Sequence, residues 1–347
     1  MNTRRPVLVA VLLGVVGAVA ATVLGFLTFG AQATAAPDHL PLAVSASDDA
    51  LRPAAQLIAE RGGDTVEWRV AEPDAARQLL ADKEVYGILE LEAGQRGVTP
   101  TVVVSGAVNP QGTQVAQQIL TGAANGLAGA LGQQGVQVAP PSVDTVHAAS
   151  TAARTAPLAA SALLWLGGLV ASIAFGLLVV RSGMRVGPLA RATLLTSAAV
   201  LVSGAVVGLL RLWDADLPLG ADVLGFVLLT AVAFASVQGA LLRLLRLRAA
   251  VILGPLYLLA PAVAGQVPEM LDPAYRTLLW SWTPFRFSTE GLRSLLQGTP
   301  DAPDVRLGVL VLAGMAVAGL VVMLWPGRAG ATPEPASTTA REPVLTG

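Results

Sequence analysis

The stretch Trp282-Thr-Pro-Phe-Arg-Phe-Ser-Thr-Glu-Gly-Leu-Arg-Ser-Leu-Leu-Gln-Gly298 lies between two long apolar runs of the chain. It carries a helix start signal, because Thr283 is followed by Pro284 at the first helical position, and Gly298 is a helix stop signal. Asp272-Pro273 is a similar start signal for a preceding helix. Each predicted helix is about half the ~20 residues that a membrane span needs. We therefore predict a short helical hairpin over residues 268–306.

The second helix of this hairpin carries three charges on one side. Glu290 lies four residues after Arg286 and three before Arg293, so the spacing predicts an ion pair with one of them. Together with Pro284, these three residues form the candidate outer hairpin site. The hairpin either lies flat on the membrane surface, with tryptophans among the lipid headgroups, or dips into the membrane as a re-entrant pair that shapes a translocation path. The resemblance described below favours the re-entrant arrangement.

The composition of the chain is that of a membrane protein. Of its 347 residues, 54% are hydrophobic and only 13% are charged, which is too apolar for a soluble domain. Six apolar runs are each long enough for a helix that crosses a bilayer. These runs cover residues 7–29, 158–180, 192–210, 223–242, 249–267 and 307–325. We therefore predict a polytopic α-helical membrane protein with six transmembrane helices, five of them in a domain over residues 157–326.

The first apolar run is predicted to be an N-terminal transmembrane anchor over residues 1–30. A cleaved signal peptide is the alternative, because the small residues at 31–36 resemble a cleavage site, but the run is longer than the ~7–15 apolar residues of a signal peptide. Gly17, Ala21 and Gly25 share one helix face, which predicts close packing against a neighbouring helix. At the other end, residues 327–347 are rich in Pro, Thr and Ala and are predicted to form a disordered cytoplasmic tail.

Residues 31–156 form a separate domain, since they carry seven basic and thirteen acidic residues. The domain has four strand-like runs, and helical patterns separate the first three of them. A longer helix at about 112–131 follows the fourth run, and residues 132–154 resemble a connector. The strand-like runs lie at 42–46, 66–70, 87–91 and 101–105. This order predicts a mixed α/β domain between spans one and two.

The placement of arginines predicts how the chain is oriented. Segments 181–191 and 243–248 each carry three arginines and no acidic residue. By contrast, Arg211 is followed closely by three aspartates. Short loops rich in arginine stay in the cytoplasm. We therefore predict a multi-pass protein of the plasma membrane, with both termini cytoplasmic and with the α/β domain and the hairpin outside the cytoplasm.

The residue content excludes several kinds of chemistry. The chain has no cysteine and only two histidines, and its one lysine, Lys83, follows Ala-Asp rather than a glycine-rich phosphate loop. No catalytic motif is present, so we predict no enzyme activity, no cofactor and no metal site. The last five apolar runs contain no Asp, Glu, Lys, Arg or His, whereas proton-coupled carriers use intramembrane carboxylates. The arginine-rich loops are explained by topology, and we expect membrane lipid rather than nucleic acid as a partner.

The run Pro284-Phe-Arg-Phe-Ser-Thr-Glu-Gly-Leu-Arg-Ser-Leu-Leu-Gln-Gly298 resembles a helix of the ABC-2 type transporter permeases: Pro, an aromatic residue, then Glu-Gly-Leu-Arg-x-Leu-Leu before the final span. Val85-Tyr-Gly-Ile-Leu-Glu-Leu91 resembles the third strand of their outer domain. The similarity is greatest to the branch that includes the phage infection protein-like membrane proteins, and it covers most of residues 7–325.

This resemblance implies an export permease that moves a hydrophobic or envelope-directed molecule, works as a homodimer or heterodimer and pairs with a separate ABC ATPase subunit. It also implies that the loop after span two contacts the ATPase. The residues of this predicted coupling loop are Arg181, Arg185, Gly187, Pro188 and Arg191. The alternative is a non-transporting cell-envelope receptor or assembly protein that acts through its outer domain.

Overall fold

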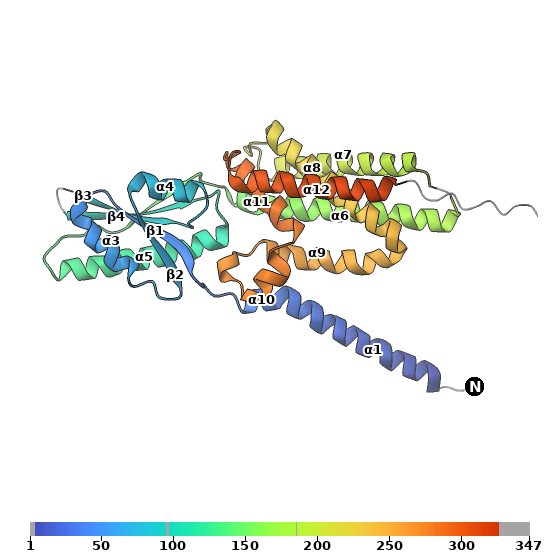
Figure 1. Cartoon of the computed structure of the whole chain (residues 1–347), viewed down its shortest axis with the longest axis horizontal. Helices are drawn as coiled ribbons and strands as arrows, with labels where there is room; N and C mark the ends of the chain where they lie inside the picture. Colours follow the sequence, from blue (N-terminus) through green and yellow to red (C-terminus); the bar gives the residue numbers. More distant parts are fainter. Residues whose placement is uncertain (1–3, 95–96, 185, 326–347) are drawn as a thin grey trace, which may run out of the picture.

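The computed structural model of the chain describes residues 4–94, 97–184 and 186–325. The predicted tail at 327–347 and Arg185 of the predicted coupling loop lie outside these described residues. A mixed α/β domain lies at one end of the molecule and a helical bundle at the other, while helix α1 (Arg4–Gly25) diverges from the bundle (Figure 1). Five helical stretches of the described chain are long and apolar enough to cross a membrane. The structure is therefore that of a helical membrane protein with a small sheet domain.

The sheet has the strand order β2-β1-β3-β4-β5. Strand β1 is parallel to both β2 and β3, β3 is antiparallel to β4, and β4 is parallel to β5. The strands are β1 (Leu40–Ala46), β2 (Val66–Ala71), β3 (Ile88–Gly94), β4 (Gly97–Ser105) and β5 (Ser142–Val146). The four predicted strands are confirmed, but the prediction of a connector over 132–154 is wrong, since it contains β5. All five residues of this edge strand are exposed, so no buried apolar run marks it.

Helices cover both faces of the sheet. Helices α3 (Arg52–Ala59) and α5 (Pro110–Gly132) pack on the face that receives Leu42 and Val44, whereas α4 (Pro73–Ala81) packs on the face that receives Ala43. Alternate side chains of β1 thus enter two different cores. Strands that are buried on both faces are nearly continuous apolar runs, which explains why the sequence pattern located the inner strands.

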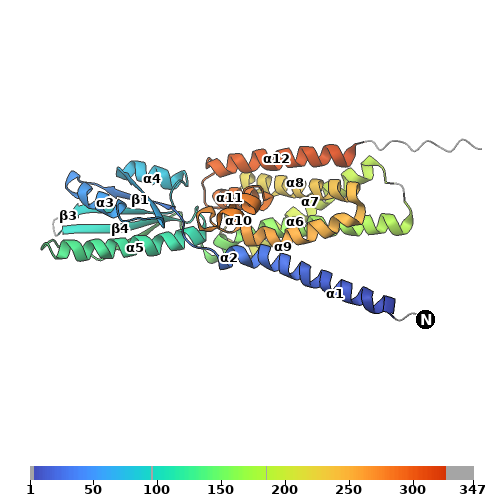
Figure 2. The same ribbon diagram turned by 60° about the horizontal axis from the view of Figure 1, so that its bottom comes forward.

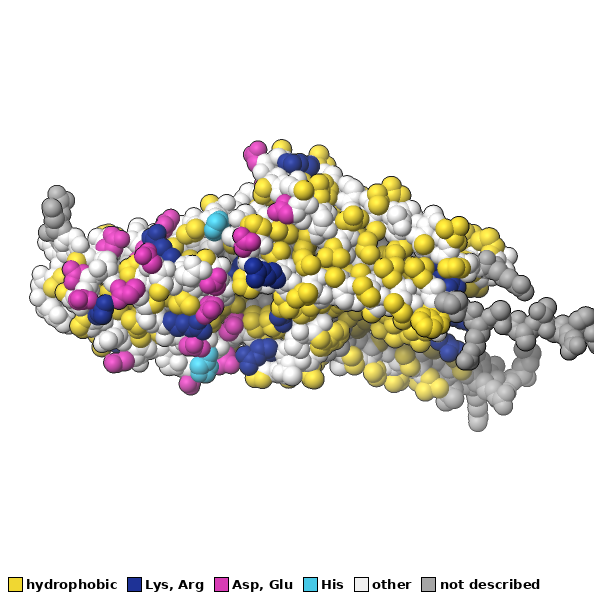
Figure 3. Space-filling model, turned by 45° about the horizontal axis from the view of Figure 1, so that its top comes forward, with side chains coloured by type: hydrophobic (Ala, Val, Ile, Leu, Met, Phe, Trp, Pro, Cys, Tyr) yellow, Lys and Arg dark blue, Asp and Glu magenta, His cyan; other side chains and the backbone are white. Residues whose placement is uncertain are grey.

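Four of the five long stretches are the bundle helices α6, α7, α8 and α12, and the fifth covers Val11–Ala33, which includes most of α1. The bundle helices are α6 (Thr151–Ser182), α7 (Pro188–Trp213), α8 (Ala221–Leu245) and α12 (Pro303–Leu324). Helix α6 begins before the predicted boundary at 156/157, because the Ser150 hydroxyl caps its first turn by accepting from the amide of Ala153 at 3.0 Å. Hydrophobic side chains cover much of the visible face of the bundle, whereas charged side chains are scattered over the sheet domain (Figure 3).

The predicted fifth span at 249–267 is shorter than expected. Helix α9 (Ala250–Ala264) has 15 residues, which gives about 22 Å at 1.5 Å per residue, against an apolar membrane thickness of about 30 Å. A 3₁₀ turn at Arg246–Ala249 takes up the start of the run. Helix α9 lies between α1 and the other bundle helices (Figures 1 and 2).

Helix α1 contacts the rest of the chain only near its C-terminal end in the described structure. A π-helical turn (Phe26–Gly30) and α2 (Ala31–Ala33) follow it, and the Tyr275 hydroxyl donates to the carbonyl of Phe26 at 2.9 Å. No heavy atom of a packing neighbour lies within 4 Å of a Cβ built on Gly17 or Gly25. The predicted small-residue face of α1 therefore meets no helix among the described residues.

The hairpin differs from its prediction in its first half. Instead of one helix, the chain forms a single turn, α10 (Pro273–Tyr275), followed by a π-helical turn (Arg276–Trp280). A π turn adds one residue to the helical repeat and rotates the residues that follow. The spacing of Tyr275, Leu278, Leu279 and Trp282 at i, i+3, i+4 and i+7 predicts one apolar helix face. This prediction is wrong, since Tyr275 is buried but Leu278 and Trp282 are exposed. The second half, α11 (Pro284–Leu296), begins at the predicted proline.

Candidate functional site

Helix α11 is a core element of the bundle rather than a helix on its surface. Phe285 packs against Trp165 of α6 and Phe234 of α8, with ring centroids 5.2 Å away in both pairs. Ser288 donates a hydrogen bond to the hydroxyl of Ser161 in α6 at 2.9 Å. Gly291 is also required, because a Cβ there would lie 2.5 Å from the ring of a bundle phenylalanine. Both apolar packing and buried hydroxyl pairs thus hold this half-length helix among the long ones.

The predicted ion pair of Glu290 forms with Arg293. Arg293 Nη1 lies 2.5 Å from Glu290 Oε2, and Arg293 is only 3% exposed. Its Nε and Nη1 have no aligned hydrogen-bond acceptor among the described residues. Arg286 takes a different position, with its guanidinium 3.6 Å from the ring centroid of Trp280 in a cation–π contact. Glu290 is therefore the close counter-charge of a buried arginine.

Lys83 joins the sheet domain to this helix. Lys83 Nζ lies 2.6 Å from Asp304 Oδ2 at the start of α12 and 2.5 Å from Ser294 Oγ of α11. The serine hydroxyl also lies 2.9 Å from the same carboxylate oxygen. Lys83 follows α4 in a left-handed conformation with φ of 60°, and this turn lets the side chain leave the sheet domain. The lysine and the aspartate are both mostly buried, with side-chain exposures of 14% and 21%.

Two further side chains of the sheet domain bond to the segment after α9. The Tyr86 hydroxyl donates to Glu269 Oε2 at 2.7 Å, and Asn109 Nδ2 donates to the carbonyl of Gly265 at 3.1 Å. Burial raises the pKa of Tyr86 well above its ordinary value, and the negative charge of Glu269 raises it further. A Cβ on Gly112 would overlap the Tyr86 ring, so the start of α5 closes over this contact.

These polar groups surround a cavity of about 220 Å³ between the sheet domain and the bundle, the junction cavity. Its polar lining consists of Lys83, Tyr86, Asn109, Gln266, Glu269, Arg286, Glu290 and Asp304. Gln266 Oε1 is buried there, and no other described residue forms a hydrogen bond with it. Both signs of charge and neutral donors face this space, so it suits a polar or zwitterionic group. The described residues contain no cluster of three or more His, Asp or Glu side chains that could hold a metal ion.

A wider cleft of about 600 Å³, the outer cleft, adjoins this cavity on the surface of the sheet domain. It shares Lys83, Tyr86 and Glu269 with the junction cavity and adds charged groups. Arg69 Nη1 lies 2.7 Å from Glu84 Oε2 on its wall. The polar lining therefore continues from the outer cleft through the junction cavity to Arg286 and Glu290 of α11.

The predicted coupling loop is built differently from a free loop. Gly187 is the N-cap of α7 and Pro188 its first residue, so these two loop residues start a helix. Arg191 Nη1 donates to the carbonyl of Met323 at 3.3 Å. Arg191 thus contacts the C-terminal end of α12, whereas Arg181 is exposed at the end of α6.

Sequence reasoning located Glu290 and Arg293 but missed the residues of the sheet domain that meet them. Lys83 and Asp304 are 221 positions apart in the chain, and no local pattern links them. The one usable signal was that Lys83 is the single lysine of the chain. Comparisons of the chain with protein-family models, with curated proteins and with solved structures find no match.

Proposed function

We propose that this chain is the membrane permease subunit of an ABC-2 type exporter, which moves a hydrophobic or envelope-directed molecule with energy from a separate ATPase subunit. The observation that carries the proposal is α11, a half-length helix buried in the bundle. Through Ser294 it meets Lys83 of the sheet domain. Irregular and broken helices at membrane depth occur where they are buried in protein or line a path. A path that begins beside α11 would open into the junction cavity.

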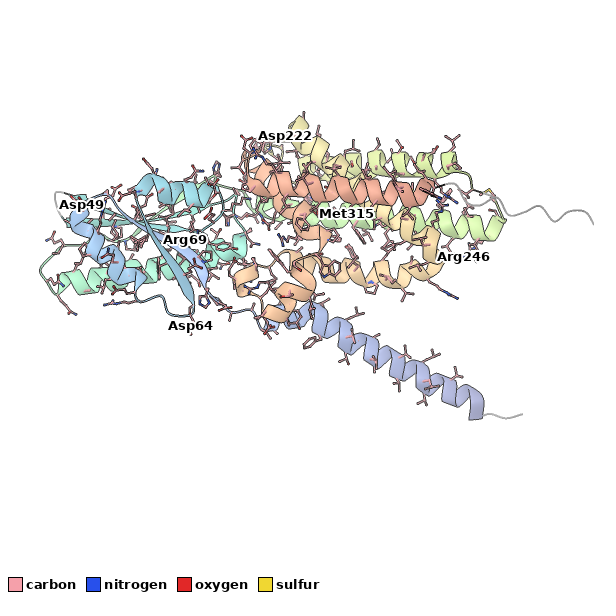
Figure 4. All side chains as sticks on the ribbon, viewed as in Figure 1. Asp49, Asp64, Arg69, Asp222, Arg246 and Met315 are labelled. Atoms are coloured by element: carbon pink, nitrogen blue, oxygen red, sulfur yellow. The ribbon has the colours of Figure 1, made fainter. Side chains whose placement is uncertain are left out.

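The proposed topology has six crossings, with α9 and its flanking turns as the fifth. Arg246 lies at the end of the bundle opposite the sheet domain, and Asp222 lies at the near end (Figure 4). The N-terminal end of α1 and the C-terminal end of α12 also lie away from the sheet domain (Figure 1). By the positive-inside rule, we assign the far end to the cytoplasm and the sheet domain to the outside.

The driving force enters from a partner in this proposal. The buried polar residues in the middle of the bundle are neutral, and they include Ser203, Thr230 and Gln238. Gln238 Nε2 donates to the carbonyl of Trp165 at 2.9 Å, and this hydrogen bond joins α8 to α6. A chain of such groups lacks the carboxylates that proton-coupled transport uses. The small-residue face of α1 has no neighbour in the described part of the chain, and we assign it as the contact with a second permease subunit.

The proposal is tested by purifying the tagged chain from its native membrane and assaying the complex for ATP hydrolysis. We expect an ATPase with a phosphate loop to co-purify, and we expect the variant Arg185→Lys with Gly187→Ala to lower its yield. Gly187 has no neighbour within 4 Å of a built Cβ, so the bundle tolerates this change. The matched control is Arg248→Lys, an exposed arginine outside the loop. Export from a membrane that holds no such ATPase would refute the proposal.

The outer cleft favours a second candidate, a receptor or assembly protein that binds a charged partner outside the membrane. Its charged wall includes Arg69 and Glu84. However, the core of the sheet domain is completed by Val267 and Met270 of the segment after α9, so the domain is built onto the bundle. The variant Arg69→Gln separates the two functions: loss of partner capture with unchanged export supports a receptor role in addition to transport. Loss of all function with the bundle intact and no ATPase bound would favour the receptor alone.

A further inference from the structure

A cavity of about 370 Å³ lies between helices α6, α7 and α8 at the end of the bundle that is remote from the sheet domain. We call it the arginine cleft, because Arg191, Arg243 and Arg246 all line it. Its other walls are mostly apolar, with Phe175 and Leu242 among them. Val180 of α6 also lines it and is 65% exposed, so the cleft opens at the outer surface of the bundle, where lipid surrounds a membrane protein.

Two of the arginines are positioned by the C-terminal end of α12. Arg243 Nη1 donates to the carbonyls of Val322 and Met323 at 2.6 and 2.9 Å, and Arg191 Nη1 donates to the carbonyl of Met323 at 3.3 Å. Cations at a helix C-terminus are stabilised by the helix dipole. These contacts hold the guanidinium groups at the cleft but use only one nitrogen of each. Arginine has five N–H donors, so most of them remain for a ligand.

Within the described chain no carboxylate forms an ion pair with any of the three arginines. Like charges gathered without acidic partners attract an anion, and the planar guanidinium fork binds phosphate through two parallel hydrogen bonds. A free phosphate does not account for the apolar walls. The volume is at the lower end of the ~300–1,000 Å³ of small-molecule sites.

We propose that the arginine cleft binds an anionic phospholipid, with its phosphate headgroup on Arg191, Arg243 and Arg246 and part of an acyl chain along α6. Basic pockets between transmembrane helices bind such headgroups in general. The ligand enters sideways from the bilayer past Val180, which needs no path through the protein. The inference does not depend on the chain being a transporter.

The test uses the full chain, delipidated in detergent, and measures bound lipid by native mass spectrometry. Phosphatidylglycerol and phosphatidylcholine with the same acyl chains are the two probes. We expect the wild type to bind phosphatidylglycerol at least about tenfold more tightly, and Arg191→Gln with Arg246→Gln to abolish that preference. The matched control is Arg181→Gln with Arg248→Gln, which removes the same charge from exposed arginines outside the cleft. An equal loss in the control pair would assign binding to surface charge and overturn the proposal.

A second variant avoids the arginines, because Arg191 also supports α12. Val180→Trp should weaken phosphatidylglycerol binding by obstructing the mouth of the cleft, whereas Leu178→Trp, at an exposed neighbour outside the cleft, should not. Unchanged binding in Val180→Trp would overturn the acyl-chain part of the proposal. A competition experiment with inorganic phosphate distinguishes the two sources of phosphate. If inorganic phosphate displaces phosphatidylglycerol at equal affinity, the cleft is a site for free phosphate and the lipid assignment is wrong.

Discussion

Replacing Glu290 by glutamine should destabilise the bundle through Arg293. Arg293 is 3% exposed and has Glu290 as its close counter-charge, at 2.5 Å. Removing one member of a buried ion pair costs about 3–5 kcal/mol, because the other charge stays buried without compensation. The Glu290 side chain is 22% exposed, so some solvent screening applies. We therefore expect Glu290→Gln to lower the free energy of unfolding by about 3 kcal/mol.

The reverse change should cost less. In Arg293→Met the remaining carboxylate of Glu290 is partly exposed and still has Arg286 four residues away. We expect Arg293→Met to lower the free energy of unfolding by about 1–2 kcal/mol. The double variant, Glu290→Gln with Arg293→Met, should lower it by about 1 kcal/mol, because an uncharged pair leaves no buried ion. The double variant should therefore be more stable than Glu290→Gln alone.

The assay is a reversible unfolding titration of the detergent-solubilised chain with a denaturing detergent. Asp301→Asn is the control, because Asp301 is an exposed acid near the same helix and surface changes stay within about 0.5 kcal/mol. The reasoning is refuted if Glu290→Gln matches this control. It is also refuted if the double variant loses the sum of the two single losses.

Three further predictions use the same titration. Lys83→Met should lower the free energy of unfolding by about 2 kcal/mol, since it removes a charge-assisted hydrogen bond from the mostly buried carboxylate of Asp304. Arg52→Met breaks an exposed ion pair with Glu72 and should cost under about 1 kcal/mol. Equal losses in the two variants would contradict this prediction. Gly319→Ala should cost about 1–3 kcal/mol, because its Cβ would lie 2.6 Å from the backbone of α8, while Gly204→Ala, with nothing within 4 Å, should cost less than half as much. Burial raises the pKa of Tyr86, so the unfolded state loses the hydroxyl proton at a lower pH than the folded state does. The free energy of unfolding should therefore fall as pH rises above about 10. Tyr86→Phe should reduce this pH dependence, and an unchanged pH dependence in the variant would show that Tyr86 does not cause it.

Local patterns predicted the elements that are rich in buried apolar residues or that begin with a proline at the first helical position. Strand β4 contains a run of three buried valines, β3 is apolar apart from Glu90 and Glu92, and α11 begins with proline after a threonine. Strand β5 lacks any such mark because all its residues are exposed, and it exists through pairing with β4. Tertiary pairing of this kind cannot be read from five residues.

The junction could not be predicted because its contacts join distant segments. Three steps of chain geometry have to be known before Lys83 can be placed beside Asp304: the left-handed turn after α4, the docking of the sheet domain and the burial of α11. The charge pattern within α11 is local, so the pairing of Glu290 with one of its neighbours was predictable. Choosing Arg293 over Arg286 required knowing which side of α11 faces the bundle.

Helix α12 connects the two charged ends of the bundle. At its first turn Asp304 accepts from Lys83, and at its last turn the carbonyl of Met323 accepts from Arg191 and Arg243. Both contacts follow the helix dipole, which favours an acid at the N-terminus and cations at the C-terminus. A 22-residue helix is about 33 Å long, and its hydrogen bonds keep that length nearly constant. The junction cavity and the arginine cleft therefore contact opposite ends of one rigid helix.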